Sequence, residues 1–370
     1  MSVSVSVRLS RTIDESYEIR IGHGIFTEEA RNAIERLQPS KIAVITDSHL
    51  NKLYSAAFKV TFGSGARIIE YRAGESRKTI ATVLRLFAEL QDAGLDRKSL
   101  VFAVGGGVTG DMAGFLAGIY LRGIPFVQVP TSLLAMADSS VGGKTGIDTP
   151  AGKNLMGVFN QPKAVIIDTG FLGTLPKKEF INGMAEVIKH GAITDADFFR
   201  KIAAARKAIT GLDRETLIWM LEKSCTIKAG VVSADEKETG LRQTLNFGHT
   251  IGHAIEAVSK FGIPHGYAVA MGMAAEGNIA AERGTLPLAD LNLLTKTLKG
   301  FGLLKYTSKI KKLDTGKVIV SAGYDKKNVA GKIKAVMLNG IGAVLEKDGK
   351  YSFEISENEL LGGLRYLAEI

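Results

Sequence analysis

Hydrophobic residues in the first half of the chain fall into short continuous runs, separated by segments with helical spacing. Continuous apolar runs rich in Val and Ile are typical of strands buried on both faces of a parallel sheet. We therefore predict buried strands at residues 41–47, 99–104, 126–129 and 164–168. Between these strands, the spacing predicts helices over 79–93 and 111–119. Strands that alternate with helices in this way indicate β-α-β units, with helices on both faces of one sheet.

After about residue 177 the hydrophobic spacing becomes helical almost throughout, with Gly and Pro at the breaks. The predicted helices span 177–192, 195–208, 213–232, 247–260, 266–283 and 287–300. Runs typical of strands return only at about 317–346. A chain of 370 residues exceeds the size at which a single core keeps growing. We predict a Rossmann-like α/β domain with a parallel sheet at 1–175, a mainly α-helical domain at 176–370, and a site in the cleft between them.

The composition argues against a membrane or secreted protein. No run of 18 or more apolar residues occurs, and the amino terminus, Met1–Arg8, alternates like an edge strand and lacks the apolar block of a signal peptide. Cys225 is the only cysteine, so no internal disulfide can form, and this side chain is expected to pack as a small hydrophobe. We expect a soluble, cytoplasmic protein that does not bind membranes.

The net charge of +9 is compatible with three kinds of partner: nucleic acid, an acidic membrane surface or a small anion. Most lysines are scattered singly, and no aromatic RNA-binding motif or Cys/His finger spacing is present. The densest basic region, Lys296–Lys334, holds eleven lysines with few aromatic residues and is expected to be a solvated face. This distribution argues against nucleic acid and favours a small, multiply charged anion.

A glycine-rich segment, Gly105–Asp111, follows the strand that ends at Val104. It satisfies the spacing G-x-G-x-x-G and precedes a predicted helix, whose amino terminus can bind a pyrophosphate. The acidic ribose-binding residue expected about 20 positions downstream is missing. Asp47, at the end of an earlier strand, could take its place. On the residues alone, a phosphate cradle and a tight structural turn both remain open.

Two lysines follow glycines where an anion could bind. The segment Ser140–Thr145 ends in Gly-Lys-Thr like a P-loop, but Asp138 stands where that loop needs a glycine, so a Walker-type site is not expected. Lys144 and Lys153 are expected in loops that follow strands, where an ammonium can meet a phosphate or carboxylate. The alternative is that both lysines are simply exposed.

Half of the six histidines lie in the seventeen residues from His249 to His265. His249 and His253 are four residues apart, so on a helix both rings project from one face and could bind zinc. A bare pair with this spacing can also be a surface accident. His265, between Pro264 and Gly266, strengthens the case for a metal.

The helical segment Gly183–Gly191 carries a second group of polar residues, Glu186, Lys189 and His190. An ion pair within the helix is the usual explanation for such spacing. A carboxylate flanked by Ala and Val nevertheless needs a partner, and a metal held together with two histidines would supply one.

These segments together resemble the 3-dehydroquinate synthases, within the sugar-phosphate cyclases, which are related by fold to iron- and zinc-dependent alcohol dehydrogenases. The resemblance covers nearly the whole span from about 70 to 340. Its blocks are Gly105–Asp111, Arg122–Asp148, Gly152–Asn154, Phe171–Pro176, Gly183–Gly191, Ala234–Glu256 and His265–Gly272. The sequence departs from the family pattern at Ser132, where threonine is usual, and at Met136-Ala137, where Gln-Val is commoner.

The resemblance implies one divalent metal, zinc or alternatively cobalt, held by Glu186, His249 and His265. His253 would then lie beside the metal and contact the substrate phosphate region or relay protons. The resemblance also implies NAD over the glycine segment. The implied NAD-binding residues are Asp47, Glu75, Lys78, Gly107, Val108, Thr109, Gly110, Asp111, Thr131, Ser132, Asp138, Lys144, Lys153, Phe171 and Thr174.

The implied substrate is a small anionic sugar phosphate. The implied substrate-binding residues are Arg122, Asp138, Lys144, Asn154, Lys189, Lys228, Arg242, Asn246, His253 and Lys334. The implied catalytic residues among them are Lys144, Asn154, Lys189, Lys228, Arg242, Asn246 and His253.

The family reaction converts 3-deoxy-D-arabino-heptulosonate 7-phosphate to 3-dehydroquinate and phosphate, in the shikimate pathway of aromatic amino acid biosynthesis. It proceeds through transient oxidation by NAD, phosphate elimination, re-reduction and intramolecular aldol closure. Two alternatives stay open: another sugar-phosphate cyclase, such as a 2-deoxy-scyllo-inosose synthase, and a metal-dependent polyol dehydrogenase. Arg122, Lys228 and Arg242 favour a substrate that carries a carboxylate, because unpaired cations in a cleft are costly. The resemblance also implies a homodimer, the commonest assembly.

Overall fold

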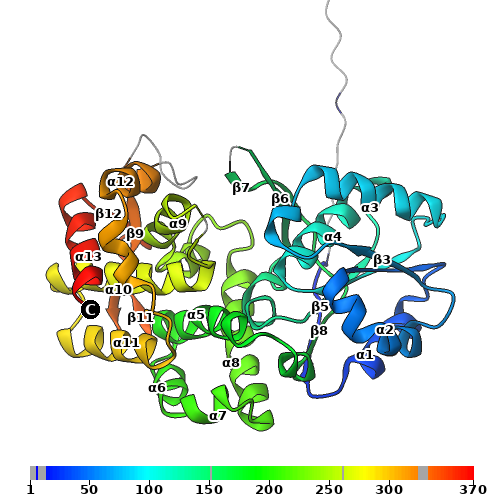
Figure 1. Ribbon diagram of the computed structural model, residues 1–370, viewed down its shortest axis with the longest axis horizontal. Coiled ribbons are helices and arrows are strands. Elements are labelled where there is room, and N and C mark those ends of the chain that lie inside the picture. The colour runs from blue at the N-terminus through cyan, green and yellow to red at the C-terminus, as the bar shows by residue number, and fades with distance from the viewer. Residues whose placement is uncertain (1–5, 7–13, 151, 261, 324–331) are drawn as a thin grey trace, which may run out of the picture.

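Six parallel strands form one sheet in the amino-terminal half of the computed structural model, which describes residues 6, 14–150, 152–260, 262–323 and 332–370 (Figure 1). Their order is β1-β8-β5-β4-β2-β3, and every neighbouring pair is parallel. The strands are β1 (Ile19–Gly22), β2 (Ile42–Asp47), β3 (Arg67–Tyr71), β4 (Leu100–Gly105), β5 (Phe126–Pro130) and β8 (Val165–Asp168). The four predicted strands are confirmed as β2, β4, β5 and β8, which form the interior of the sheet.

Four helices cover the two faces of this sheet. They are α1 (Phe26–Leu37), α2 (Ser48–Phe62), α3 (Ile80–Asp92) and α4 (Gly107–Ile119). Successive strand residues point to opposite faces, so in β4 Phe102 joins the core under α1 and α2, whereas Val101 joins the core under α3 and α4. Both predicted helices are confirmed as α3 and α4, although α4 begins inside the glycine segment.

The carboxy-terminal half is mainly helical, as predicted. Its helices are α5 (Lys177–Thr194), α6 (Ala196–Ala204), α7 (Arg206–Thr210), α8 (Arg214–Ala234), α9 (His249–Val258), α10 (His265–Glu282), α11 (Leu288–Gly300), α12 (Thr315–Gly323) and α13 (Glu357–Glu369). Two small antiparallel pairs complete it: β9 (Lys334–Val336) with β12 (Ser352–Glu354), and β10 (Leu338–Gly340) with β11 (Ala343–Val344). No described helix is both long and apolar enough to cross a bilayer.

Helix α10 is the centre of the carboxy-terminal half. It is buried continuously from Gly266 to Ala280 because it packs against α5, α9, α11 and α13. A helix that is apolar all round is typical of such a position. Glu276 is the one charged residue in this buried stretch, and its carboxylate accepts hydrogen bonds from the N–H groups of Gly248 (2.6 Å) and Ile251 (3.2 Å) at the start of α9. The start of α9 is therefore fixed to α10.

A hairpin of β6 (Lys144–Thr149) and β7 (Gly152–Phe159) packs on α4 and extends toward the carboxy-terminal half (Figure 1). Lys144 is the first residue of β6, and Lys153 lies in β7. The expectation that both lysines lie in loops was therefore wrong. The two strands pair in register, with Thr145 opposite Val158, and this pairing satisfies the backbone groups that a loop would leave to water.

Two further expectations need correction. The predicted helix at 195–208 is broken at Ala205 into α6 and α7. The strand expected from about 317 begins instead as α12, because Asp314 accepts a hydrogen bond from the N–H of Lys317 (3.1 Å) and caps a helix. Among the residues described in this region, strands begin at Lys334. The edge strand expected at Met1–Arg8 falls outside the described residues, apart from Ser6.

Candidate metal and nucleotide site

Glu186, His249 and His265 meet where three helices of the carboxy-terminal half converge. Glu186 lies in α5, and His249 and His265 are the first residues of α9 and α10. Glu186 Oε1 lies 3.7 Å from Nε2 of His249 and 3.7 Å from Nε2 of His265. The ligand atoms of a tetrahedral zinc ion are about 3.4 Å apart when its bonds are ~2.1 Å long. The three side chains therefore need only a small adjustment to bind one ion.

The residue after His265 sets how closely α10 approaches α5. The N–H of Gly266 donates to Oδ1 of Asn182 (2.8 Å), one helical turn before Glu186. A Cβ atom on Gly266 would lie 1.9 Å from the carbonyl oxygen of Asn182. Only glycine fits here, and this close contact holds His265 next to Glu186.

Acceptors at the Nδ1 atoms orient both histidine rings. Nδ1 of His249 lies 3.3 Å from the carbonyl oxygen of Phe247, and Nδ1 of His265 lies 3.2 Å from Oε2 of Glu256. An acceptor at Nδ1 favours the tautomer that carries its proton there, which leaves the Nε2 lone pair for a metal. Both Nε2 atoms face Glu186.

Glu186 is completely buried and its two carboxylate oxygens have different surroundings. Oε2 accepts from Nζ of Lys189, whereas Oε1 has no hydrogen-bond donor among the described residues. Burial alone would raise the pKa of Glu186, but Lys189 and His265 hold it well below its usual range. Burial alone would lower the pKa of His265, but the neighbouring carboxylates of Glu186 and Glu256 raise it to about 9. An anionic oxygen and two imidazoles fit the donor preference of zinc.

His253 lies next to the same cluster. Its ring centroid is 5.1 Å from that of His249 and 5.6 Å from that of His265, and ring nitrogens of the three histidines lie within 4.8 Å of one another. A three-histidine site is therefore the geometric alternative. Compared with the three-histidine site, the set of Glu186, His249 and His265 gives the unsatisfied Oε1 atom a partner, so the ligand set implied by the resemblance fits better.

A second buried polar cluster lies behind Glu186. Asp138 Oδ1 lies 2.6 Å from Nζ of Lys228, and both groups are charged: burial alone would raise the pKa of Asp138, but Lys228 lowers it to about 2. His190 also lies close to Glu186, since ligand atoms of Asp138, Glu186 and His190 are within 4.8 Å of one another, and its Nδ1 is 2.8 Å from Oγ of Ser224. Burial and the neighbouring Lys189 lower the pKa of His190 to about 3, so this ring is neutral at pH 7.

Residues 235–246 bring three predicted substrate ligands together. Lys144 Nζ pairs with Oε2 of Glu238, and Nδ2 of Asn246 donates to Oε1 of the same carboxylate (2.7 Å). The buried guanidinium of Arg242 donates to the carbonyl oxygens of Glu236 (2.6 Å) and Gly142 (3.1 Å). Glu238 was not predicted. No spacing rule signals it, because it contacts Lys144 only through the fold.

Several of the predicted NAD residues lie at the carboxyl ends of β2, β4 and β5. Gly106 precedes α4 and no described side chain caps this helix, so its first N–H groups remain open to a phosphate. Asp47 ends β2, the strand next to β4, and caps α2 by accepting from the N–H groups of His49 (2.9 Å) and Leu50 (3.0 Å). Thr131 and Ser132 follow β5. The sheet order thus places an acidic residue beside the glycine segment, as the hypothesis required.

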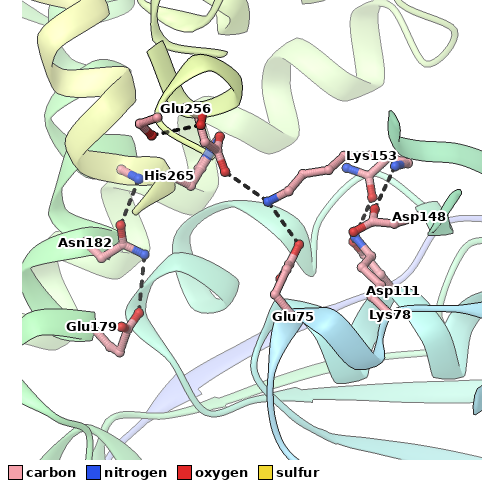
Figure 2. Close-up of polar contacts among 12 residues, drawn as sticks. Glu75, Lys78, Asp111, Asp148, Lys153, Glu179, Asn182, Glu256 and His265 are labelled. Atoms are coloured by element: carbon pink, nitrogen blue, oxygen red, sulfur yellow. Dashed lines mark hydrogen bonds and ion pairs between the residues drawn. The ribbon is translucent and has the colours of Figure 1, made fainter. Parts of the chain in front are cut away.

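A cluster around Lys78 connects predicted cofactor and substrate residues. Lys78 is buried, with Nζ 2.5 Å from Oδ2 of Asp111, and it also donates to Oδ1 of Asn154. The N–H of Asn154 donates to Oδ1 of Asp148 (2.9 Å), which was not predicted (Figure 2). Burial raises the pKa of Asp111 even though Lys78 opposes this shift.

Phe171 and Thr174 follow β8 and contact Tyr54. Thr174 Oγ1 lies 2.6 Å from the Tyr54 hydroxyl, and the rings of Phe171 and Tyr54 are 5.0 Å apart. Tyr54 was not predicted as a site residue. Its place at the exposed edge of α2 gave no sequence signal.

Two predicted substrate ligands are placed less directly. Arg122 is exposed and follows the carboxyl end of α4, about 20 Å along the helix from the glycine segment at its amino end. Lys334 begins β9, and its carbonyl oxygen accepts from Oγ1 of Thr250 in α9 (2.8 Å). The structure thus brings the Lys334 backbone to the metal helices but does not bring Arg122 to the site of the same chain. The roles of both residues stay predictions.

Two family models match the chain. The model for the amino-terminal part of 3-dehydroquinate synthase matches residues 68–182, and the model for the carboxy-terminal part matches residues 183–328. They meet within α5, so the boundary between 175 and 176 remains a prediction.

Curated relatives cover most of the chain. The 3-dehydroquinate synthase of Pelobacter propionicus is 42% identical over 333 residues, which is 89% of this chain and 92% of the relative. The 3-dehydroquinate synthase of Streptococcus pneumoniae is 40% identical over 334 residues, 88% of this chain and 92% of the relative.

Solved structures agree on the fold. A 2-deoxy-scyllo-inosose synthase in complex with carbaglucose-6-phosphate, NAD+ and Co2+ superposes with a TM-score of 0.86 at 27% identity, covering 95% of this chain and 96% of the other. A 2-epi-5-epi-valiolone synthase from Streptomyces hygroscopicus shares the fold with a TM-score of 0.85 at 24% identity, over 98% of this chain and 99% of the other. The chain belongs to the 3-dehydroquinate synthase family.

Proposed function

We propose that this protein converts 3-deoxy-D-arabino-heptulosonate 7-phosphate to 3-dehydroquinate and phosphate, as an NAD- and metal-dependent carbon–oxygen lyase of the shikimate pathway. Family membership supports the reaction. The observation that supports the metal is Glu186 Oε1, which is buried, has no hydrogen-bond donor among the described residues, and faces Nε2 of His249 and His265. Such an oxygen is costly unless a cation binds it.

When bound, the metal would lower the pKa of a substrate hydroxyl, and NAD would accept and later return a hydride at that carbon. His253 lies beside the two imidazole ligands, where it can hold or move a proton at the substrate. The cleft between the two halves would hold one conformer of the substrate for ring closure.

The charges around the site suit a substrate with two anionic groups. Four cations, Lys144, Lys189, Lys228 and Arg242, stand against three carboxylates, Glu186, Asp138 and Glu238. With a divalent ion bound, this nearly balanced set would carry an excess of positive charge. A carboxylate and a phosphate on one small molecule would neutralise that excess.

Incubation of the protein with the heptulosonate phosphate, NAD and zinc tests this proposal. We expect 3-dehydroquinate and one phosphate per turnover, with no lasting absorbance at about 340 nm because NADH is reoxidised in each cycle. A polyol dehydrogenase would accumulate NADH instead. Glucose 6-phosphate and sedoheptulose 7-phosphate, which lack the carboxylate, serve as controls. Phosphate release from either of them, and none from the heptulosonate, would assign the protein to another cyclase activity.

We also propose that the chain forms a homodimer. Ile119 and Leu121, at the carboxyl end of α4, and Leu155, Met156 and Phe159, on the neighbouring β7, are exposed apolar side chains that a second subunit could cover. Arg122 follows Leu121, so a dimer formed through this surface would bring Arg122 against the partner subunit. Light scattering of the purified protein gives the mass, and Phe159→Asp should lower it to that of a monomer. The cytoplasmic location stays a prediction.

A further inference from the structure

Glu256 joins the metal cluster to the nucleotide half of the molecule (Figure 2). It lies on α9, seven residues after His249, and therefore on the same face of the helix. Its side chain is only 6% exposed, and each carboxylate oxygen has its own partner. Oε2 lies 3.2 Å from Nδ1 of His265, and Oε1 lies 2.9 Å from Nζ of Lys153.

The contact with His265 fixes a proposed metal ligand. A carboxylate at Nδ1 holds the ring in place and favours the tautomer whose Nε2 is free to bind a metal. His249 obtains the same support from a backbone carbonyl, that of Phe247. The orientation of His265 thus depends on a side chain.

The contact with Lys153 crosses between the two halves of the chain. Lys153 lies in β7, and its ammonium also lies 3.2 Å from Oε1 of Glu75, in the 3-10 turn η1 (Glu75–Arg77) that follows β3. One ammonium is therefore shared by a carboxylate of the nucleotide half and a carboxylate of the metal half. Burial lowers the pKa of Lys153, but Glu256 and Glu75 together raise it, so the ammonium stays charged.

We propose that Glu256 is a positioning residue that serves both cofactors: it orients His265 toward the metal and holds Lys153 of the β6–β7 hairpin at the NAD site. This inference rests on the proposed ligand set and on the proposed contact of Lys153 with NAD. It predicts that one carboxylate sets the affinity for zinc and the affinity for the nucleotide.

Three variants separate the two contacts. Glu256→Ala removes both contacts of this carboxylate. Lys153→Met removes the contact between the halves, together with the ion pair to Glu75, but leaves the contact of Glu256 with His265. Glu256→Gln keeps an oxygen that can accept from His265 but loses the charge that attracts Lys153. Glu222→Gln, on the exposed face of α8, is the matched control. Zinc affinity is measured without substrate, by competition with a chelator, and nucleotide affinity from the fluorescence of bound NADH.

We expect Glu256→Ala to weaken zinc binding about 10- to 100-fold, the range found when a carboxylate behind a metal-bound histidine is lost. Glu256→Gln should weaken zinc binding less. Lys153→Met should leave zinc binding unchanged, and Lys153→Met, Glu256→Ala and Glu256→Gln should all weaken NADH binding. The absorption spectrum of the cobalt-substituted protein should change in Glu256→Ala but not in Lys153→Met. Only Glu256→Ala removes the carboxylate that orients His265, a proposed metal ligand.

Wild-type zinc affinity in a folded Glu256→Ala protein, judged by circular dichroism, would overturn the inference. So would loss of zinc without any loss of NADH affinity. If Glu256→Ala does not fold, Glu256→Gln is compared with Lys153→Met instead. An equal loss of zinc affinity in these two variants would contradict the inference that Glu256 acts on the metal through His265 and not through Lys153. Failure of the wild-type protein to bind zinc at all is a different result, and it would refute the proposed ligand set instead.

Discussion

Gly272 of α10 contacts Gly248, the residue before α9, so closely that a Cβ atom on Gly272 would lie 1.9 Å from the carbonyl oxygen of Gly248. The same Cβ atom would lie 2.7 Å from the backbone nitrogen of Gly252. Helices α9 and α10 can approach to this distance only without side chains between them. This approach puts His249 and His265, their first residues, within reach of one ion.

Gly272→Ala should therefore separate the two helices. Because the obstructing atoms belong to the backbone, we expect a loss of about 1–3 kcal/mol or more in the free energy of unfolding, as for other overpacked cores. Zinc affinity should fall with it. Gly230→Ala in α8 is the control, since no atom lies within 4 Å of its added Cβ. Urea unfolding measures the stability of both variants, and competition with a chelator measures their zinc affinity. Equal stability of the two variants would contradict the account.

Sequence patterns located the interior of the sheet but not its edges. The buried strands β2, β4, β5 and β8 are apolar on both faces, and this makes them visible as continuous runs. The edge strands β1 and β3 carry charged residues such as Arg20 and Glu70 on solvated positions, which interrupt the run. Helix α12 was mistaken for a strand because Val318, Ile319 and Val320 are β-branched, whereas the capping Asp314 decided the outcome.

The sequence indicated many residues of the site, but not which of them contact one another. The clustered histidines indicated a metal, but spacing alone paired His249 with His253, because helical periodicity relates only residues of one helix. His265 lies next to Glu186 because α10 packs against α5, and no local sequence pattern encodes this packing. Glu256 lay one helical repeat from His249 and could have been noticed by that spacing. Its contact with Lys153 could not be predicted, because Lys153 comes from a different part of the fold.

Substitution of single histidines should distinguish ligands from the neighbouring base. We expect His249→Ala and His265→Ala to lose bound zinc after dialysis, because each removes one of three protein ligands. His253→Ala should retain zinc and lower kcat by about 10²- to 10⁴-fold, the range for a lost proton-transfer group. Metal content and steady-state rates check these outcomes. Zinc loss from His253→Ala together with zinc retention by Glu186→Ala would favour the three-histidine site.

Asp235 should matter for substrate affinity although it contacts no proposed ligand group. Its carboxylate accepts from the N–H groups of Thr239 (3.0 Å), Gly240 (2.7 Å) and Arg242 (3.0 Å) and so holds the turn that carries Arg242. Burial alone would raise the pKa of Asp235, but these hydrogen bonds lower it to about 2, so the charge persists across the working range of pH.

Asp235→Ala should raise KM about tenfold or more, the effect of losing roughly one charge-assisted hydrogen bond, with a smaller change in kcat. Asp213→Ala, which removes the cap of α8, is the control because it should cost about 1 kcal/mol of stability without changing KM. An unchanged KM in Asp235→Ala would show that the turn does not position Arg242.

Stability in acid should depend on Glu359, far from the site. The Arg283 guanidinium, 2.6 Å away, and hydrogen bonds from Ser356 lower the pKa of Glu359 to about 2. Because the unfolded pKa is about 4.3, the carboxylate stabilises the fold fully above that pH and loses its effect as the pH falls toward 2. Glu359→Gln should cost about 1 kcal/mol at pH 7, given the partial exposure of the pair.

The cost of Glu359→Gln should disappear between about pH 4 and pH 2. Unfolding free energies of the wild-type protein and the variant, measured at intervals from pH 7 to pH 2.5, follow this convergence. A difference that stays constant down to pH 2.5 would show that the carboxylate charge is not what stabilises the start of α13.

Anomalous diffraction at the zinc edge, from crystals grown with zinc and NAD, tests the central claim most directly. The account predicts one strong peak about 2.1 Å from Oε1 of Glu186 and from Nε2 of both His249 and His265, with the nicotinamide close enough for one sugar to touch both. A peak bonded to His253 in place of Glu186, or a nicotinamide too distant to share a substrate with the metal, would contradict it.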